Sequence, residues 1–225
     1  MHSVAVAVIN NMPFIQTAFF ESIVHLLFEG ARTASLALMS VKAFPVDFAR
    51  NWAMKQFMSA KRYKGVDWFL FLDIDQTFPR NTVKMLLDAA DENKAKVVSG
   101  VYFKRNFHSE VVGWKYNLAN TVIEPILDGT VQEVEIIGMG CALIHRSVIE
   151  EMGYPWFQYG PLHETVQTLA TEDIWFCQRC KELNIPIYIH TGIICGHIMT
   201  IENTENRIIV TSLSDGVAEG KVGPV

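Results

Sequence analysis

Apolar residues in the first half of the chain form short runs that alternate with longer segments of helical spacing. The runs predict strands at Val4–Ile9, which is rich in β-branched residues, and at Leu36–Val41, Val66–Leu72 and Lys96–Tyr102. The segments between them have apolar residues three and four apart, which predicts helices at Phe14–Glu29, Val46–Ala60 and about Arg80–Asp88. This β-α-β-α-β-α-β order predicts a doubly wound, mostly parallel sheet with helices on both faces.

The second half of the chain has shorter apolar runs and more turn residues. Short strands are predicted at Val111–Trp114, Thr121–Glu124, Val131–Ile137 and Cys141–Ile144. Helices are predicted at Ser147–Met152 and Thr171–Leu183, a strand at Ile185–His190, and a loop at Tyr154–Ala170. We therefore expect a small antiparallel element in the second half, beside the central sheet.

Length and composition favour a single α/β domain of Rossmann-like type. The chain has 225 residues, of which 50% are hydrophobic, enough for a sizeable core. We expect this domain to cover residues 1–213. The glycines and the proline after Ser214 predict a flexible tail over residues 214–225.

Charge and hydropathy exclude some partners. The net charge of −5 argues against a broad nucleic-acid-binding face, which needs clustered Lys and Arg. The apolar stretch Phe14–Phe28 contains Gln16, Glu21 and His25 and is too short to cross a bilayer. The first residues carry no basic cluster typical of a signal peptide. We expect a soluble, cytoplasmic protein without a transmembrane segment.

Two carboxylates, Asp73 and Asp75, directly follow the most apolar predicted strand, Val66–Leu72. Its unbroken hydrophobicity indicates burial on both faces, and ligands of open α/β sheets bind outside the carboxyl ends of such strands. Two carboxylates this close repel each other unless a cation or hydrogen-bond donors neutralise them. A hard divalent cation that also contacts substrate phosphates fits this arrangement. The alternative is that both residues start a turn and cap the next helix.

A second acidic pair, Glu172 and Asp173, lies at the predicted start of a helix, after the N-cap candidate Thr171. The helix dipole favours negative charge there, which alone explains the pair structurally. The functional hypothesis is that one carboxylate accepts a proton from a hydroxyl.

Three further groups are candidates. His197 could complete a metal site with Asp75, because imidazole binds transition metals, although a lone histidine is often structural. Arg50, in a predicted helix, could bind a phosphate or be an exposed helix residue. Cys177, Cys180 and Cys195, with His197, could instead form a zinc site, but the spacing of the first two also fits the buried face of a helix.

In their order along the chain, these motifs resemble GT-A-fold glycosyltransferases, particularly family 2-like members. The resemblance spans Val4 to Ile198. The motifs are Ala49-Arg50-Asn51, the DxD motif Asp73-Ile74-Asp75, the segment Gly138–Arg146, Pro155-Trp156-Phe157, Thr171-Glu172-Asp173 and Gly196-His197.

The resemblance implies a fold, a reaction and roles for individual residues. It implies a GT-A domain that transfers a sugar from a nucleoside-diphosphate sugar to a hydroxyl, with Mn²⁺ or Mg²⁺ and with inversion. Asp75 and His197 would bind the metal, and Asp73 would contact the ribose or the metal. Asp173 would be the catalytic base and Glu172 would orient the acceptor. Arg50 would contact the donor diphosphate, and Gly138 and Gly140 would line the donor pocket.

Other functions remain open at this point. A nucleotidyltransferase also uses a doubly wound sheet and acidic metal ligands, but the chain has no Gly-rich phosphate loop after Val4–Ile9. A sugar-nucleotide-binding module that lost its chemistry is the second alternative. The acceptor is undetermined and could be a glycan, a lipid or a small molecule. The basic residues in Phe103–Phe107 could contact a phosphate, the acceptor or solvent.

Overall fold

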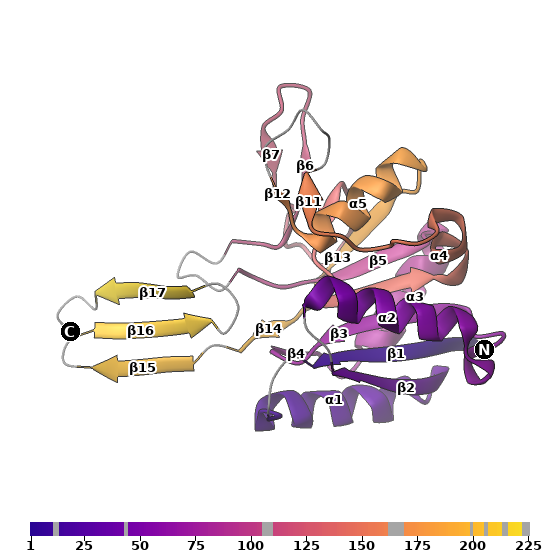
Figure 1. The fold of residues 1–225 in the computed structure, drawn as a ribbon, viewed down its shortest axis with the longest axis horizontal. Coiled ribbons are helices and arrows are strands. Elements are labelled where there is room, and N and C mark those ends of the chain that lie inside the picture. Colours follow the sequence, from indigo (N-terminus) through magenta and orange to yellow (C-terminus); the bar gives the residue numbers. More distant parts are fainter. Residues whose placement is uncertain are drawn as a thin grey trace.

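A computed structural model describes residues 1–10, 14–42, 45–104, 110–161, 169–198, 200–204, 207–212 and 216–221. Within these residues a seven-stranded central sheet has the order β2-β1-β3-β10-β5-β13-β8 (Figure 1). Its strands are β2 (Ala34–Lys42), β1 (His2–Asn10), β3 (Trp68–Asp73), β10 (Cys141–His145), β5 (Val97–Val101), β13 (Ile187–Ile194) and β8 (Val131–Val134). All run in one direction except β10 and β8, so the predicted mostly parallel sheet is confirmed.

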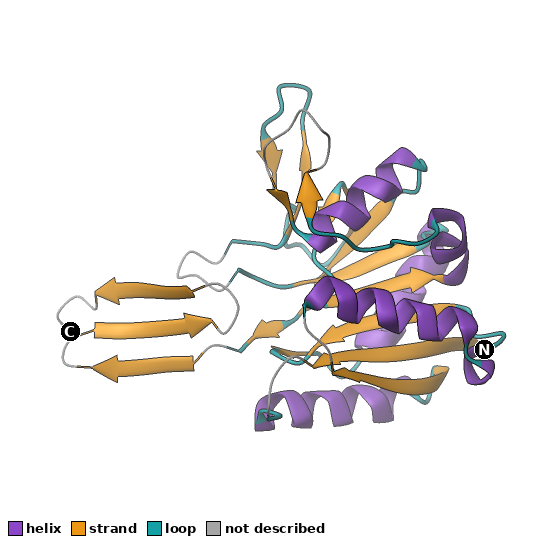
Figure 2. Ribbon diagram, viewed as in Figure 1, coloured by secondary structure: helices purple, strands orange, loops and turns teal. Residues whose placement is uncertain are grey.

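Helices cover both faces of the sheet, as Figure 2 shows. The helices are α1 (Thr17–Gly30), α2 (Val46–Ser59), α3 (Thr82–Asn93), α4 (Arg146–Met152) and α5 (Glu172–Glu182), with a 3-10 turn η1 (Lys61–Tyr63). Alternate residues of β3 point to opposite layers: Phe69 packs in the layer of α2, α4 and α5, and Leu70 in the layer of α1 and α3. Burial on both faces explains the unbroken hydrophobicity of this strand.

The second half of the chain departs from the expected order in two strands. The predicted strand Cys141–Ile144 is β10, which lies in the middle of the main sheet and pairs antiparallel with both β3 and β5. The predicted strand Val131–Ile137 divides into β8 and β9 (Ile136–Ile137). β8 joins the edge of the main sheet. β9 joins β6 (Gly113–Tyr116) and β7 (Val122–Ile123) in the small antiparallel element that was expected.

Three smaller sheets complete the structure. They consist of β4 (Gln76–Thr77) with β14 (Gly196–His197), β11 (Gly160–Pro161) with β12 (Leu169–Ala170), and β15 (Thr200–Thr204), β16 (Arg207–Ser212) and β17 (Gly216–Lys221). Part of the predicted tail, 216–221, is thus a strand paired with β16. The flexibility predicted for residues 214–225 stays a prediction. Among the described residues no helix is long and apolar enough to cross a membrane.

Candidate functional site

The candidate site lies at the carboxyl edge of the sheet, where β3 ends at Asp73. The chain turns through Ile74 and Asp75 into β4, and β4 pairs with β14 so that His197 lies opposite Gln76. The N–H of Ile198 also donates to the carbonyl of Asp75 at 2.7 Å. This short pairing brings together two predicted metal ligands that are 122 positions apart, and the Nε2 of His197 lies 4.0 Å from Oδ1 of Asp75.

A hydrogen bond made by its second ring nitrogen, Nδ1, orients the imidazole of His197. Nδ1 lies 2.7 Å from the carbonyl oxygen of Phe103, which can only accept a hydrogen bond, so Nδ1 is the protonated nitrogen. In the neutral imidazole, Nε2, which lies on the side of Asp75, is then the nitrogen with the lone pair. The ring also packs edge-on against Tyr102, with centroids 5.8 Å apart. A histidine held in this way by a backbone carbonyl is typical of metal-binding histidines.

Arg50 joins the two acidic motifs of the sequence. Its guanidinium is buried and donates to Oδ2 of Asp73 at 3.0 Å and to Oε1 of Glu172 at 3.3 Å. It also donates to the carbonyl of Met139 at 3.5 Å and lies over the ring of Phe71, 5.3 Å from its centroid. The sequence predicted a contact of Arg50 with the donor diphosphate. In the structure the guanidinium binds carboxylates, and a diphosphate contact stays a prediction.

The electrostatics of this network follow from burial and pairing. Burial alone lowers the pKa of Arg50, but the neighbouring carboxylates Asp73 and Glu172 raise it by more, so that it lies above its ordinary value. Burial raises the pKa of Glu172, and the nearby Arg50 opposes this rise. Burial and the carboxylate of Glu172 raise the pKa of Tyr159, whose hydroxyl is hydrogen-bonded to that carboxylate. Arg50 is therefore a permanent cation that compensates two carboxylates.

Asn51, the neighbour of Arg50, holds the Pro155-Trp156-Phe157 segment in place. Its Nδ2 donates to the carbonyl of Phe157 at 2.6 Å, and its Oδ1 accepts from the N–H groups of Trp156 at 3.0 Å and Phe157 at 3.2 Å. Phe157 in turn stacks on Phe176 of α5, with centroids 5.2 Å apart. The Arg50-Asn51 pair thus connects α2 to β3, to this segment and to the N-terminus of α5.

Asp173 lies in the first turn of α5, whose N-cap is Thr171, as predicted. The hydroxyl of Thr171 donates to Oδ1 of Asp173, and so does the N–H of Ile174 at 2.9 Å. Both contacts use Oδ1, which leaves Oδ2 as the oxygen that can accept a proton. Glu172, by contrast, is buried against Arg50. Of the two predicted acids, Asp173 is therefore the less buried one, and its role as a base stays a prediction.

Gly138 and Gly140 lead into β10 and are packed against side chains of the protein itself. A Cβ on Gly138 would lie 1.6 Å from the hydroxyl of Tyr102, and a Cβ on Gly140 would lie 2.0 Å from Nε2 of Gln76. The N–H of Gly140 also donates to the Tyr102 hydroxyl at 3.4 Å. The space that was expected to admit a ligand at these glycines is filled by Tyr102 and Gln76. A role of both glycines in donor binding stays a prediction.

Replacing Gly138 by Ala is expected to destabilise the protein by about 1–3 kcal/mol, because the new methyl group cannot coexist with the buried Tyr102 hydroxyl. Urea unfolding followed by circular dichroism measures this change. Gly160→Ala is the control, since its Cβ would only reach Gln158 at 3.7 Å, an ordinary contact. Equal effects of the two substitutions would contradict the packing role given to Gly138.

The residues at the site fit a divalent cation with few protein ligands. Within the described ranges, no cluster of three His, Cys, Asp or Glu side chains could hold a metal ion. Asp73, predicted to contact the metal or the ribose, is paired with Arg50, and its Oδ1 is buried without a hydrogen-bond partner. Asp75 and His197 are thus the two candidate ligands. A cation of the Mg²⁺ or Mn²⁺ type that takes its other ligands from phosphates and water fits such a pair.

The alternative zinc site is wrong. Cys177 and Cys180 lie in the core layer of α2, α4 and α5, whereas Cys195 lies in the layer of α1 and α3, on the other face of the sheet. All are buried free thiols, and burial raises the pKa of Cys177 and Cys180, which opposes the thiolate that zinc requires. The interpretation of Cys177 and Cys180 as part of the buried face of a helix is confirmed, since both are buried residues of α5.

Several site residues were not predicted as such from the sequence. Tyr102 and Gln76 are buried polar residues next to the motifs, and Tyr159 reaches Glu172 from the connection between α4 and α5. A buried polar side chain signals function only when its partners are known, and these partners are distant in sequence. Of the basic residues in Phe103–Phe107, Lys104 forms an ion pair with Glu110 at 2.6 Å, and 105–107 lie outside the described residues.

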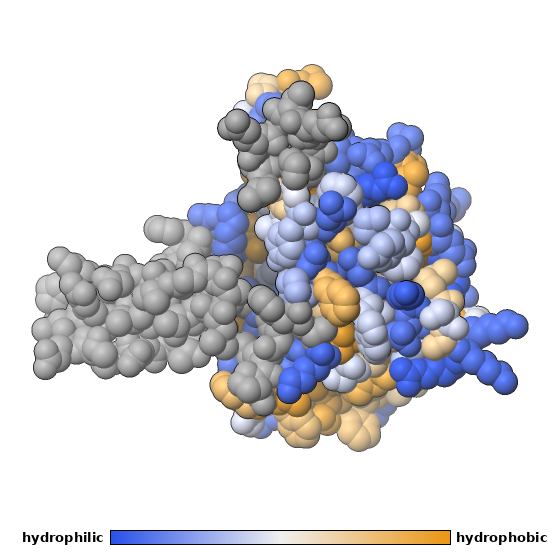
Figure 3. All heavy atoms as spheres, in the orientation of Figure 1, coloured by the Kyte–Doolittle hydropathy of each residue, from blue (hydrophilic) through white to orange (hydrophobic). Residues whose placement is uncertain are grey.

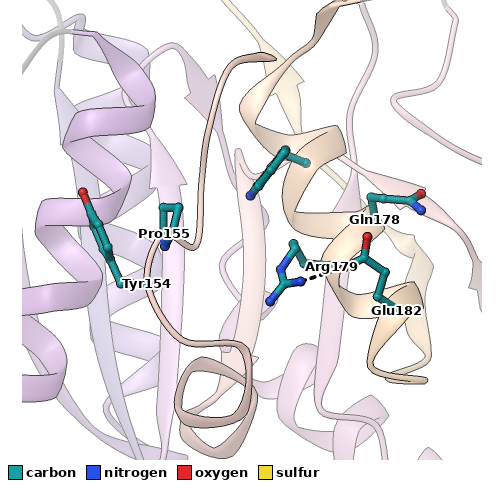
Figure 4. Close-up of a pocket in the computed structure, with 6 residues that line it drawn as sticks. Tyr154, Pro155, Gln178, Arg179 and Glu182 are labelled. Atoms are coloured by element: carbon teal, nitrogen blue, oxygen red, sulfur yellow. Dashed lines mark hydrogen bonds and ion pairs between the residues drawn. The ribbon is translucent and has the colours of Figure 1, made fainter. Parts of the chain in front are cut away.

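A separate pocket of about 160 Å³ lies between α5 and the segment that follows α4 (Figure 4). It is lined by Tyr154, Pro155, Trp175, Gln178, Arg179 and Glu182. Two of the lining side chains, Arg179 and Glu182, form an ion pair with each other at 2.7 Å. It contains none of the predicted site residues and is not part of the candidate site.

Comparisons with known proteins agree with this geometry. The crystal structure of A197 from STIV superposes with a TM-score of 0.56 at 16% identity, covering 100% of this chain and 97% of that one. The crystal structure of GalNAc-T7 with UDP, GalNAc and Mn²⁺ has a TM-score of 0.57 at 10% identity, covering 87% of this chain and 43% of that one. These likenesses establish the GT-A fold alone. No curated protein matches the chain.

The sequence itself matches the model of a known family. The match covers residues 41–153, half of the chain. It runs from the end of β2 to the end of α4 and includes Arg50, Asp73, Asp75 and both glycines at β10. The chain therefore belongs to glycosyl transferase family 2 and is a glycosyltransferase.

Proposed function

We propose that this glycosyltransferase transfers a sugar from a nucleoside-diphosphate sugar to a hydroxyl acceptor, with a divalent cation and with inversion at the anomeric carbon. The observation that carries the proposal is the convergence of the acidic motifs at one edge of the sheet. Arg50 links Asp73 to Glu172, next to the catalytic-base candidate Asp173, and Asp75 lies beside His197. A metal-binding pair, an anchored cation and a carboxylate base are the groups that this reaction requires.

Asp75 and His197 would hold the divalent cation. Nε2 of His197 and Oδ1 of Asp75 lie 4.0 Å apart, so that one cation could contact both side chains. One carboxylate and one imidazole favour a transition metal such as Mn²⁺ over Mg²⁺. When bound, such a cation would neutralise the negative charge that develops on the departing nucleoside diphosphate.

Asp173 would act as the base in a single displacement. The acceptor oxygen bonds to the anomeric carbon as the bond from that carbon to the diphosphate oxygen breaks, and the acceptor proton moves to Oδ2 of Asp173. Asp173 lies in the first turn of α5, where the helix dipole interacts favourably with acidic residues. Glu172 is buried against Arg50 and hydrogen-bonded to Tyr159, and it would hold the N-terminus of α5 in place beside β3.

The other assignments complete the proposal. Residues 1–213 would form the catalytic domain, and 154–170 would cover the bound donor; of this segment, 162–168 lie outside the described residues. Gly138 and Gly140 would line the donor pocket by their backbone. The acceptor would be a glycan, a lipid or a small molecule that the enzyme meets in the cytoplasm or through a membrane-bound partner.

Calorimetric titration with nucleoside diphosphates and sugar nucleotides, with and without Mn²⁺, tests the proposal. We expect one nucleoside diphosphate to bind only with the metal, and Asp75→Asn to weaken this binding at least about tenfold. Asp91→Asn is the matched control, since Asp91 contacts His2 on the surface. Absence of binding by the folded wild-type protein would refute the proposal. Metal-dependent binding without sugar transfer would indicate an inactive sugar-nucleotide-binding module.

A further inference from the structure

The first edge of the central sheet is an uncovered strand of unusual composition. β2 has nine residues, Ala34–Lys42, and within the described part of the chain no strand pairs with its outer edge. It contains no proline, and Lys42, its last residue, carries its only charge. Soluble proteins protect such edges with charges, prolines, bulges or short strands, because the unpaired N–H and C=O groups accept another strand. β2 has none of these protections along its first eight residues.

Exposed apolar side chains lie on both sides of this edge. On the face of α1, Leu38 of β2 is 53% exposed. On the face of α2, Phe48 and Trp52 are 57% and 40% exposed and line a hollow of about 330 Å³ with Ser40, Val41 and Lys42. Hydrophobic atoms also gather along the lower border of Figure 3, where Figure 1 places α1. Grouped exposed apolar residues of this kind mark an interaction surface.

The chemistry of the edge favours a strand over a lipid surface as the occupant. The hydrocarbon of a bilayer would accept the exposed leucine and aromatic side chains, but it offers no hydrogen bonds to the backbone groups of an open edge. A second strand satisfies both requirements. A second copy of this chain always brings such a strand, and two-fold pairing lets one surface bind itself.

The sequence of β2 is compatible with pairing to itself. In an antiparallel arrangement centred on Leu38, that residue lies opposite Leu38 of the second copy, Leu36 opposite Ser40, and Ala34 opposite Lys42. No two charges face each other in this register, and the two leucines form an apolar cross-strand pair.

We propose that β2 is a homodimer interface, in which two copies join antiparallel through this strand into one continuous sheet. A nine-residue strand is about 30 Å long, and the sheet with its two flanking helix layers is about 25 Å thick at the edge. The contact would therefore cover roughly 750 Å² per copy, close to the ~800 Å² per partner of a standard stable interface.

Sedimentation velocity over a wide range of protein concentrations tests this interface without any substrate. We expect the wild-type chain to dimerise and Leu38→Lys to raise the dissociation constant at least about tenfold, because two lysines would then face each other. Leu118→Lys is the matched control, since Leu118 is fully exposed between β6 and β7, away from this edge. Far-UV circular dichroism verifies that each variant folds.

A mixing experiment tests the register. Leu38→Lys mixed with Leu38→Glu should restore dimers that neither variant forms alone, because opposite charges then meet at the two-fold axis. A wild-type chain that stays monomeric at every concentration would overturn the proposal, and so would equal effects of Leu38→Lys and Leu118→Lys. Association with phosphatidylcholine–phosphatidylserine vesicles in place of self-association would also overturn it and would identify lipid as the occupant. None of these outcomes depends on the proposed sugar transfer.

Discussion

Replacing Asp173 by Asn is expected to lower kcat by about 10²- to 10⁴-fold, the contribution of a general base, with little change in donor affinity. Asn has nearly the shape of Asp and keeps an oxygen for the contacts from Thr171 and Ile174, so the start of α5 should remain intact. Initial rates of nucleoside-diphosphate release with a competent sugar donor and acceptor, together with calorimetric donor binding, measure the two effects separately.

Glu182→Gln is the control for this prediction. It removes the same charge near the other end of α5, where Glu182 pairs with Arg179 at the surface, and its rate should match that of the wild type. A variant Asp173→Asn with near wild-type kcat would exclude this residue as the base. If Asp173→Asn weakened donor binding as well as lowering kcat, Asp173 would be assigned to donor binding and not to proton transfer.

Replacing Arg50 by Met is expected to lower the free energy of unfolding by about 3–5 kcal/mol, the cost of leaving buried charges unpaired. The variant keeps an apolar side chain over Phe71, but Asp73 and Glu172 lose their shared cation. Chemical unfolding by urea at neutral pH measures the difference. Arg32→Met is the control, because its ion pair with Glu29 is exposed, and its effect should stay within about 0.5 kcal/mol.

The loss of stability in the Arg50→Met variant should also depend on pH. Burial already raises the pKa of Glu172 in the folded protein, and removal of Arg50 raises it further. The folded state then binds a proton more tightly than the unfolded state, so stability decreases as pH rises through the unfolded and then the folded pKa. The difference in the free energy of unfolding between the wild type and the variant should therefore become smaller as the pH falls. A deficit independent of pH would show that lost packing, and not unpaired charge, is its cause.

Local pattern was sufficient for most of the fold. The four strands and three helices of the first half lie close to their predicted positions, as β3 (Trp68–Asp73) and α2 (Val46–Ser59) illustrate, although α3 continues to Asn93, beyond its predicted end at Asp88. Periodic burial encodes these elements in adjacent residues, and the alternating order of strands and helices then restricts the topology. The position of Asp73 and Asp75 at the carboxyl edge follows from the same pattern.

The pairing of distant segments was not available from local pattern. Nothing near Cys141–His145 indicates that β10 inserts antiparallel between β3 and β5, because any buried strand has the same composition. The division of Val131–Ile137 between two sheets likewise depends on which strand edges remain open after the rest of the chain has folded.

The sequence by itself determined the element order, the family motifs and the candidate acids; the tertiary structure decided which of them act together. Arg50 and Glu172 are 122 positions apart, and only the packing of α2 and α5 on one face of the sheet makes their ion pair possible. Tyr102 fills the space above Gly138, and β14 carries His197 to Asp75. Such contacts depend on which distant segments pack together, and no periodic pattern in the sequence marks them. The reason why each residue lies at the site is therefore seen only in the folded structure.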